Sequence, residues 1–172
     1  MFQINDTVSY GTQGVCTITK IEKMNLLGKA EEYFVLEPIF QSGSKIYVPL
    51  SNPALLEKMR RVLSRQEIEE LIKVMPDDET IWIKNDAERK EKFGQIISSG
   101  ESKKIAQIIK TLYLEQCERQ KNGKRLRQSD EALLNRAETI LYNEFALVLN
   151  IKPEQVVPFL HEQIGIDTLN KK

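Results

Sequence analysis

The hydrophobic pattern of this chain changes its period once, and the change divides the sequence into two parts. Near the N-terminus, Phe2, Ile4, Val8 and Tyr10 occupy alternate positions on either side of a polar break. Alternation with a period of two is typical of a β-strand that buries one face. From Ser51-Asn52-Pro53 onwards, apolar residues recur at steps of three and four, which is the spacing of amphipathic helices. The sequence therefore predicts a β region followed by a helical region.

The β region carries signals for about four or five short strands. A β-branched run, Val15–Ile21, follows a corner marked by Gly11 and Gly14. A third strand begins near Glu32, and the last strand signal ends at Pro49. So many strands in so short a stretch predict a small, strongly bent sheet or barrel.

The helical region contains recognisable helix starts. Asn52 fits an N-cap with Pro53 at the first helical position, and Ser64-Arg65-Gln66-Glu67 is a capping box. We expect longer helices over residues 86–98, 101–120 and 129–149, and a short helix that starts at Pro153. The segment Thr80–Asn85 is compatible with a turn or with an extended bridge.

Composition and motifs argue against an enzyme or a metalloprotein. The 172 residues are 41% hydrophobic with a formal net charge of zero, as in a soluble globular protein. Cys16 and Cys117 lie far apart without a CxxC motif, which indicates packed thiols, and His161 is the sole histidine. The sequence contains no nucleotide-binding or metalloprotease motif, no bilayer-spanning apolar run and no secretory signal. We expect a cytoplasmic protein that is not an enzyme, needs no cofactor and has no membrane association.

Positive charge is concentrated in the middle of the helical region. Residues 89–136 hold 12 basic and 6 acidic side chains, a net charge of +6 in a neutral chain. Within them, the run from Arg119 to Arg127 has five basic residues and no acid: Arg119, Lys121, Lys124, Arg125 and Arg127. Such a run fits phosphate contact on nucleic acid, with Arg89 and Lys90 as extensions of the surface. The alternative is an ordinary solvated loop after a helix C-terminus.

Several stretches, taken in order, resemble the CarD/CdnL family of bacterial transcription regulators. At the N-terminus the resemblance rests on Phe2, Asn5-Asp6, Val8, Tyr10 and Gly14-Val15. In the helical region it rests on Ser99-Gly100-Glu101, on Ile108–Arg119 (IIKTLYLEQCER) and on Asp130–Ala146 (DEALLNRAETILYNEFA). Transcription-repair coupling factors share the N-terminal module, but a chain of 172 residues leaves no room for their helicase.

The resemblance implies an α+β protein with two domains. Residues 1–52 would form a small Tudor-like or SH3-like β-barrel module, and residues 53–172 an all-α helical domain. In the family, an exposed edge strand of the module pairs with a lobe of the RNA polymerase β subunit, helped by two arginines. Met24 and Tyr47 stand at the positions of these arginines in this chain, and Lys45 and Pro49 flank the second position. Strand addition uses main-chain hydrogen bonds, so the binding mode can survive this change.

Trp82, the sole tryptophan, has two interpretations. In the family, a tryptophan at the start of the helical domain wedges into the DNA minor groove beside the melted promoter, and apolar wedges of this kind partly unstack a base step. An ungapped alignment on Ser99-Gly100 places the family's tryptophan on Asp86, and Ile81 and Ile83 flank the ring. These observations favour a packing role for Trp82 in the core or between the domains.

The resulting hypothesis is a monomeric transcription regulator that docks on RNA polymerase and contacts promoter DNA, mainly at the backbone and minor groove. It would stabilise the open complex by binding the melted state better than the closed one. Two alternatives remain: a protein-interaction adaptor without DNA contact, and an independent nucleic-acid-binding regulator.

Overall fold

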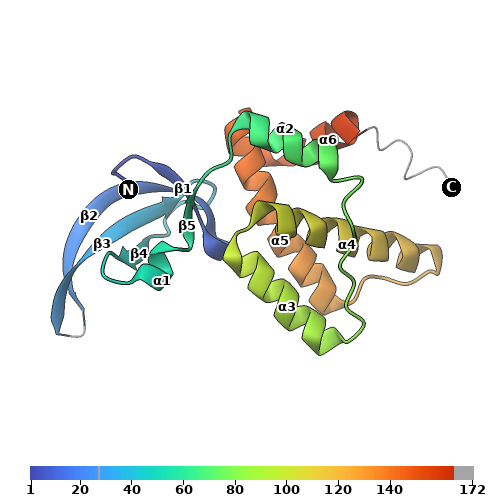
Figure 1. The fold of residues 1–172 in the computed structure, drawn as a ribbon, viewed down its shortest axis with the longest axis horizontal. Coiled ribbons are helices and arrows are strands. Elements are labelled where there is room, and N and C mark those ends of the chain that lie inside the picture. Colours follow the sequence, from blue (N-terminus) through green and yellow to red (C-terminus); the bar gives the residue numbers. More distant parts are fainter. Residues whose placement is uncertain (27, 165–172) are drawn as a thin grey trace. The chain divides into compact units, whose positions relative to one another are not determined.

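The structure, a computed structural model, describes residues 1–26 and 28–164 (Figure 1). Contacts along the chain divide it into two compact units, Met1–Val62 and Leu63–Lys172. The first unit contains an antiparallel sheet and the second is helical, so the predicted α+β class, with a small β module followed by helices, is confirmed.

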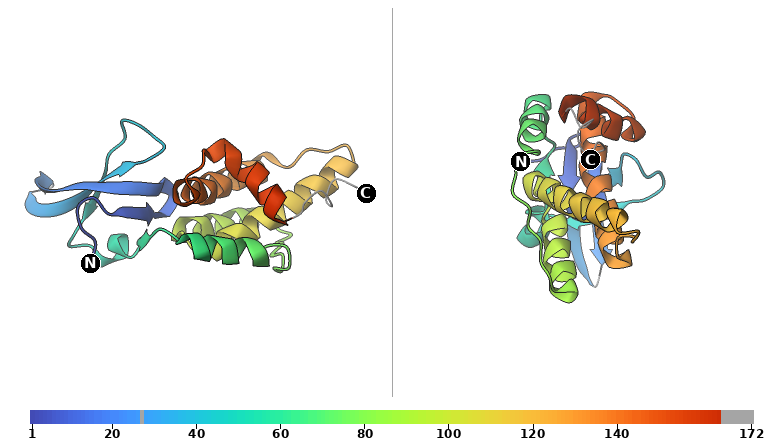
Figure 2. Two further views of the ribbon diagram at one scale, coloured as in Figure 1. Left: turned by 90° about the horizontal axis from the view of Figure 1, so that it is seen from above. Right: turned by 90° about the vertical axis from the view of Figure 1, so that its right-hand side faces the viewer.

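The β unit is built on a five-stranded antiparallel sheet in the order β4-β3-β2-β1-β5. The strands are β1 (Thr7–Tyr10), β2 (Gly14–Leu26), β3 (Lys29–Pro38), β4 (Ile46–Pro49) and β5 (Met59–Arg61). β1 pairs with β2 only over Gly14 to Thr17, so the β2–β3 hairpin extends beyond β1 as an arm (Figures 1 and 2). A register shift between Ile18 and Lys20 interrupts the β2–β3 ladder, and bulges of this kind bend a strand.

The predicted corner between the first two strands is a single turn of 3₁₀-helix, η1 (Gly11–Gln13). Gly11 and Gly14 have φ angles of 45° and 70°, a region that costs glycine little. The core of the unit lies on one face of the sheet and contains Val8, Cys16, Ile18, Phe34, Leu36, Val48 and Met59. Burial raises the pKa of the Cys16 thiol to about 11, which agrees with the expectation of a packed, inert cysteine.

The residues after Ser51 are not all helical. Asn52 does cap a short helix, α1 (Pro53–Leu56), by accepting a hydrogen bond from the Leu55 N–H. The chain then returns to the sheet, because Met59–Arg61 pairs with β1 as an edge strand. The contacts therefore divide the chain after Val62, whereas the hydrophobic pattern placed the division after residue 52. A strand of three residues is too short to show a period.

The helical unit starts at the predicted capping box. The Ser64 hydroxyl accepts from the Glu67 N–H and the Glu67 carboxylate accepts from the Ser64 N–H, at 3.2 and 2.8 Å. The helices are α2 (Arg65–Val74), α3 (Asp86–Ser99), α4 (Ser102–Lys121), α5 (Gln128–Leu149) and α6 (Val156–Ile164), with a 3₁₀ turn η2 (Pro153–Gln155) before α6.

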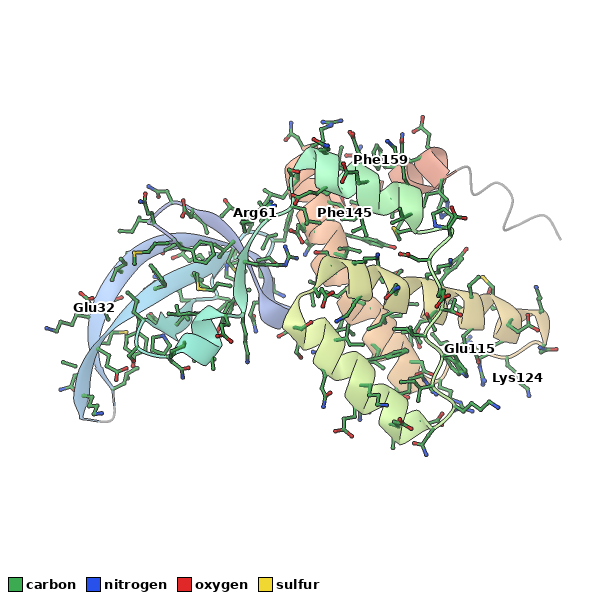
Figure 3. The ribbon with its side chains drawn as sticks, in the orientation of Figure 1. Glu32, Arg61, Glu115, Lys124, Phe145 and Phe159 are labelled. Carbon is green, nitrogen blue, oxygen red and sulfur yellow. The ribbon has the colours of Figure 1, made fainter. Side chains whose placement is uncertain are left out.

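Helix α5 is the centre of this unit and contacts α2, α3, α4 and α6. Its buried residues include Leu141 and Phe145, which are 0% exposed, and Figure 3 labels Phe145 on this helix. The helix ends at Asn150, which adopts a left-handed φ of 57° as a C-cap residue commonly does. Buried residues from all five of these helices form one apolar core.

The segment between α2 and α3, here called the bridge, turns at residues 75–78, has no regular secondary structure over residues 79–83 and bends at residues 84–85. It passes across α4 (Figure 1). Ile81 and Ile83 are half-buried and pack against the helical core, and the Ile81 N–H donates to Thr111 Oγ1 on α4 at 3.1 Å. Trp82 stands between these two anchored residues. Trp82 is 39% exposed and is therefore less deeply packed than these two neighbours.

Candidate nucleic-acid interface and strand edge

A buried ion pair lies beside the bridge. Arg89 on α3 is 0% exposed and Asp130 on α5 is 2% exposed. The Arg89 Nε and Nη2 groups donate to the two Asp130 oxygens, each at 2.7 Å, in the bidentate geometry of strong charge-assisted hydrogen bonds. The Nη1 group donates to the Ile83 carbonyl at 2.8 Å, and Nη2 also donates to Asp86 at 3.0 Å. Arg89 thereby joins the bridge, α3 and α5.

The charged state of Arg89 is favoured despite its burial. Desolvation is the largest single influence and lowers the pKa of the guanidinium, but hydrogen bonds and charge from Asp130 and Asp86 together raise the pKa above its ordinary value. The sequence placed Arg89 among the DNA-contacting residues because of its charge. Its hydrogen-bond donors are directed into the helical unit and not to the surface. We therefore propose that Arg89 supports Trp82 and does not itself contact DNA.

Trp82 lies directly on this ion pair. The Arg89 guanidinium carbon is 4.3 Å from the centre of the indole ring, within the range of a cation–π contact. The side chain is nevertheless 39% exposed. Trp82 is therefore neither a core residue nor a free surface ring: it is an exposed aromatic side chain that rests on a buried cation.

Arg127 extends the same network to the start of α5. Its Nη1 group donates to Asp86, the carboxylate that also accepts from Arg89. Arg127 is about half exposed, so one part of the guanidinium is engaged while the rest faces solvent. Asp86, where the ungapped alignment placed the family's tryptophan, thus serves as an acceptor for two arginines.

The loop between α4 and α5 has an ordered backbone. The Lys124 N–H donates to the Arg119 carbonyl at 2.9 Å, Gly123 has a left-handed φ of 67°, and Leu126 is buried at 7% exposure. The Arg119 Nε group donates to the Arg125 carbonyl at 2.7 Å. The backbone of this basic run is therefore held by hydrogen bonds at its start and in its middle.

Its five basic residues consequently differ in availability. Arg119 lies 3.7 Å from Glu115 and Lys121 lies 3.6 Å from Glu118, in loose ion pairs. Lys124 and Arg125 are exposed, and within the described residues no ion pair of their side chains is seen. Figure 3 shows Lys124 in the loop and Glu115 on the preceding helix. Lys90, on α3, is also exposed.

The structure brings Trp82 and the basic run together. Trp82 and Lys121, distant in sequence, line one open pocket of about 370 Å³. Thr80 and Thr111 contribute polar walls and Leu114 an apolar one, with Glu115, Cys117 and Glu118 along α4. The two glutamates of this pocket are the partners of Arg119 and Lys121, so they offset part of the positive charge. The pocket thus offers a flat ring for stacking. Lys124 and Arg125, whose side chains form no ion pair within the described residues, lie farther along the loop.

In the β unit, β4 is an edge of the sheet. The Leu50 N–H donates to the Glu32 carbonyl at 2.9 Å, and hydrogen-bonded pairs alternate with non-bonded pairs along an antiparallel ladder. Val48 opposite Phe34 is therefore the next bonded pair, and the main-chain groups of Tyr47 are directed to the free edge. The Pro49 carbonyl already accepts from the Asn52 N–H at 3.3 Å. Pro49 has no N–H to offer, so Tyr47 carries the central outward N–H and C=O of β4.

Side chains near this edge combine aromatic and charged groups. Lys20, Val35 and Tyr47 lie side by side across β2, β3 and β4. Tyr47 is 40% exposed, and Lys45 lies 3.7 Å from Glu37 in an exposed ion pair. Met24 is half-buried on the hairpin arm opposite Glu31, so it can reach a partner only if the partner covers the arm as well as the β4 edge.

The described residues hold no cluster of three or more histidine, cysteine, aspartate or glutamate side chains placed to bind a metal ion. Among the same residues, none of the helices has the length and apolar character needed to cross a membrane.

Comparison with known proteins covers both units. Residues 2–63 match the family model described as the CarD-like/TRCF RID domain, and residues 70–161 match the model described as the CarD C-terminal domain. A protein of Bacillus subtilis (strain 168) named "Putative transcription factor YdeB" is 24% identical over 159 residues, which are 92% of this chain and 99% of that protein. The two matches follow the same order as the two units of the structure.

Proposed function

Because the chain belongs to the CarD family of transcription regulators, we propose that it docks on the RNA polymerase β subunit with its β unit and contacts promoter DNA with its helical unit. The match of residues 2–63 to the RID model supports the polymerase interaction. The protein would act as a single copy in the cytoplasm, without a cofactor and without catalysis of its own.

For polymerase binding we propose strand addition at β4. The outward N–H and C=O of Tyr47 can pair with a strand of the partner, and main-chain hydrogen bonds of this kind are tolerant of side-chain identity. The exposed Tyr47 ring and the Lys45–Glu37 pair would supply side-chain contacts. Tyr47 thus replaces charge complementarity at this position with aromatic contact area.

For DNA binding, the observation that carries the proposal is the position of Trp82 on Arg89 and in one pocket with Lys121. A ring held on one side and exposed on the other can stack on an unpaired base or wedge against a distorted base step. Lys124, Arg125 and the exposed part of Arg127 would contact the phosphates beside it. These contacts carry no direct sequence information, so we expect similar effects on different promoters.

The mechanism is a shift of population. Only a promoter with unstacked bases offers Trp82 a partner, so the regulator binds the open complex more tightly than the closed one and stabilises it by that difference. Docking on polymerase raises the local concentration of the helical unit at the DNA, which fits a chain whose net charge is zero.

The proposal is tested with purified polymerase and a promoter whose open-complex lifetime is measured by competitor challenge. The unmodified protein should lengthen the lifetime, and Trp82→Ala should lose most of this effect while still binding polymerase. Trp82→Phe, which keeps an aromatic face, should retain part of it. If Trp82→Ala lengthens the lifetime as much as the unmodified protein does, the helical unit acts without the tryptophan and the adaptor alternative gains support.

A further inference from the structure

A second pocket of the helical unit shares Leu114 with the pocket beside Trp82 but is otherwise lined by different residues. It has a volume of about 530 Å³, within the range of small-molecule sites, and opens between the end of α2 and helices α4, α5 and α6. Its walls are mainly apolar, with Met75 and Pro76 at the end of α2, Ile109 and Leu114 on α4, and Val157, Leu160 and Ile164 on α6.

The pocket has few polar groups, and they differ in whether they already have a hydrogen-bond partner. Lys110 is committed, because its Nζ donates to the Pro76 carbonyl at 2.6 Å and also to the Asp78 carbonyl. Glu138, half-buried on α5, lines the same pocket, and within the described residues no hydrogen bond or ion pair of its carboxylate is seen. Two tyrosines, Tyr113 and Tyr142, line the same pocket.

The carboxylate of Glu138 is poorly solvated where it lies. Desolvation raises its pKa, and no neighbouring cation contributes to lower it. Burial likewise raises the pKa of the Tyr142 hydroxyl, with a smaller contribution from the charge of Glu138. A carboxylate in an apolar pocket without a cationic partner disfavours the folded state, and such groups are often retained for a binding role.

We propose that this pocket binds a small organic cation, a protonated amine on an apolar body. The ammonium group would pair with Glu138, which lacks a cation, and the electron-rich faces of Tyr113 and Tyr142 would favour the same charge. The apolar body would occupy the space between Leu114, Val157 and Leu160.

The test uses the full chain with 2-phenylethylamine as the probe and 2-phenylethanol as its uncharged counterpart, both titrated by calorimetry. The amine should bind more tightly than the alcohol, and Glu138→Gln should lower the amine affinity by about tenfold, the effect of losing one charge-assisted contact. Val157→Trp, which fills the pocket from its exposed rim, should abolish binding of both probes. Glu131→Gln, which removes an exposed carboxylate from the same helix, should bind like the unmodified chain.

The pH dependence gives an independent measurement. The titratable groups that line the pocket with Glu138 are Lys110 and Tyr113 on α4, Tyr142 on α5 and His161 on α6. Amine affinity should rise with pH as Glu138 ionises, and Glu138→Gln should remove this rise. Equal affinity for amine and alcohol, a pH dependence that survives in Glu138→Gln, or failure of the amine to bind at all would each overturn the proposal.

Discussion

The guanidinium carbon of Arg89 lies 4.3 Å from the centre of the Trp82 ring. This contact joins a residue that has no exposed surface to one that is 39% exposed. Arg89 cannot move without breaking its two hydrogen bonds to Asp130, so the indole rests on a fixed support. An aromatic ring held in this way loses little conformational entropy when it stacks on a base, which favours binding.

The ion pair between Arg89 and Asp130 should be essential for the stability of the helical unit. Arg89→Leu leaves Asp130 buried without its partner, so we expect the free energy of unfolding to fall by about 3–5 kcal/mol. The double variant Arg89→Leu/Asp130→Leu should be more stable than Arg89→Leu, because it leaves no unpaired buried charge. Urea unfolding followed by the fluorescence of the single tryptophan measures both. A single variant as stable as the unmodified chain would contradict the burial of the pair.

Trp82→Ala should separate stability from function. The ring is 39% exposed, so removing it costs the cation–π contact and some buried surface. The loss should be about 2 kcal/mol, below the 3–5 kcal/mol of a fully packed aromatic residue. Circular dichroism measures the unfolding, since the variant has no tryptophan fluorescence. A loss in the larger range would mean that Trp82 has a core role, and would restore the packing interpretation.

Local signals in the sequence were sufficient for most of the fold. The capping box at Ser64 and the N-cap at Asn52 depend on residues within one turn of each other, and both form as predicted. Strand β5 was missed because Met59–Arg61 is defined by its pairing with β1, far away in sequence. The ion pair beneath Trp82 was missed because it also joins distant residues: Asp130 is 41 positions from Arg89. The sequence shows the charge of a residue but not its burial. A basic residue in a charged stretch therefore looked like part of the surface.

The two cations of the basic loop without ion pairs should matter more than the paired ones. Lys124→Glu with Arg125→Glu should shorten the open-complex lifetime, and the deficit should shrink as salt is raised, because exposed charges are screened. Polymerase binding should be unchanged. Lys73→Glu with Lys103→Glu, two exposed reversals on α2 and α4, changes the net charge by the same amount and is the control. Equal effects of the two changes would indicate a general influence of charge instead of a contact by this loop.

The free edge of β4 can be tested by removing one outward N–H. Tyr47→Pro should leave the β3–β4 ladder intact, because the Tyr47 N–H is directed away from β3, and proline is tolerated at such edge positions. Binding to the polymerase β subunit should be lost or strongly weakened. Tyr47→Val separates the ring from the main chain and should bind more tightly than the proline variant. Val48→Pro, which removes an N–H directed to β3, should instead unfold the unit, as circular dichroism would show.

The pH dependence of stability should reveal the cost of burying the Glu138 carboxylate. Its folded pKa is raised by desolvation above the ordinary value of 4.5, while an unfolded chain keeps the ordinary value. The unfolded state therefore ionises first as pH rises, and the contribution of Glu138 to stability, complete below the ordinary value, is lost as pH passes through the folded pKa. Glu138→Gln cannot ionise, so the melting temperature of the variant relative to the unmodified chain should rise across that interval and then stay constant at neutral pH. Thermal unfolding at pH 4 and pH 8 measures the difference, with Glu131→Gln as the matched exposed carboxylate. A smaller advantage for Glu138→Gln at pH 8 than at pH 4 would mean that the ionised carboxylate is stabilised in the fold, and hence that a cation already pairs with it.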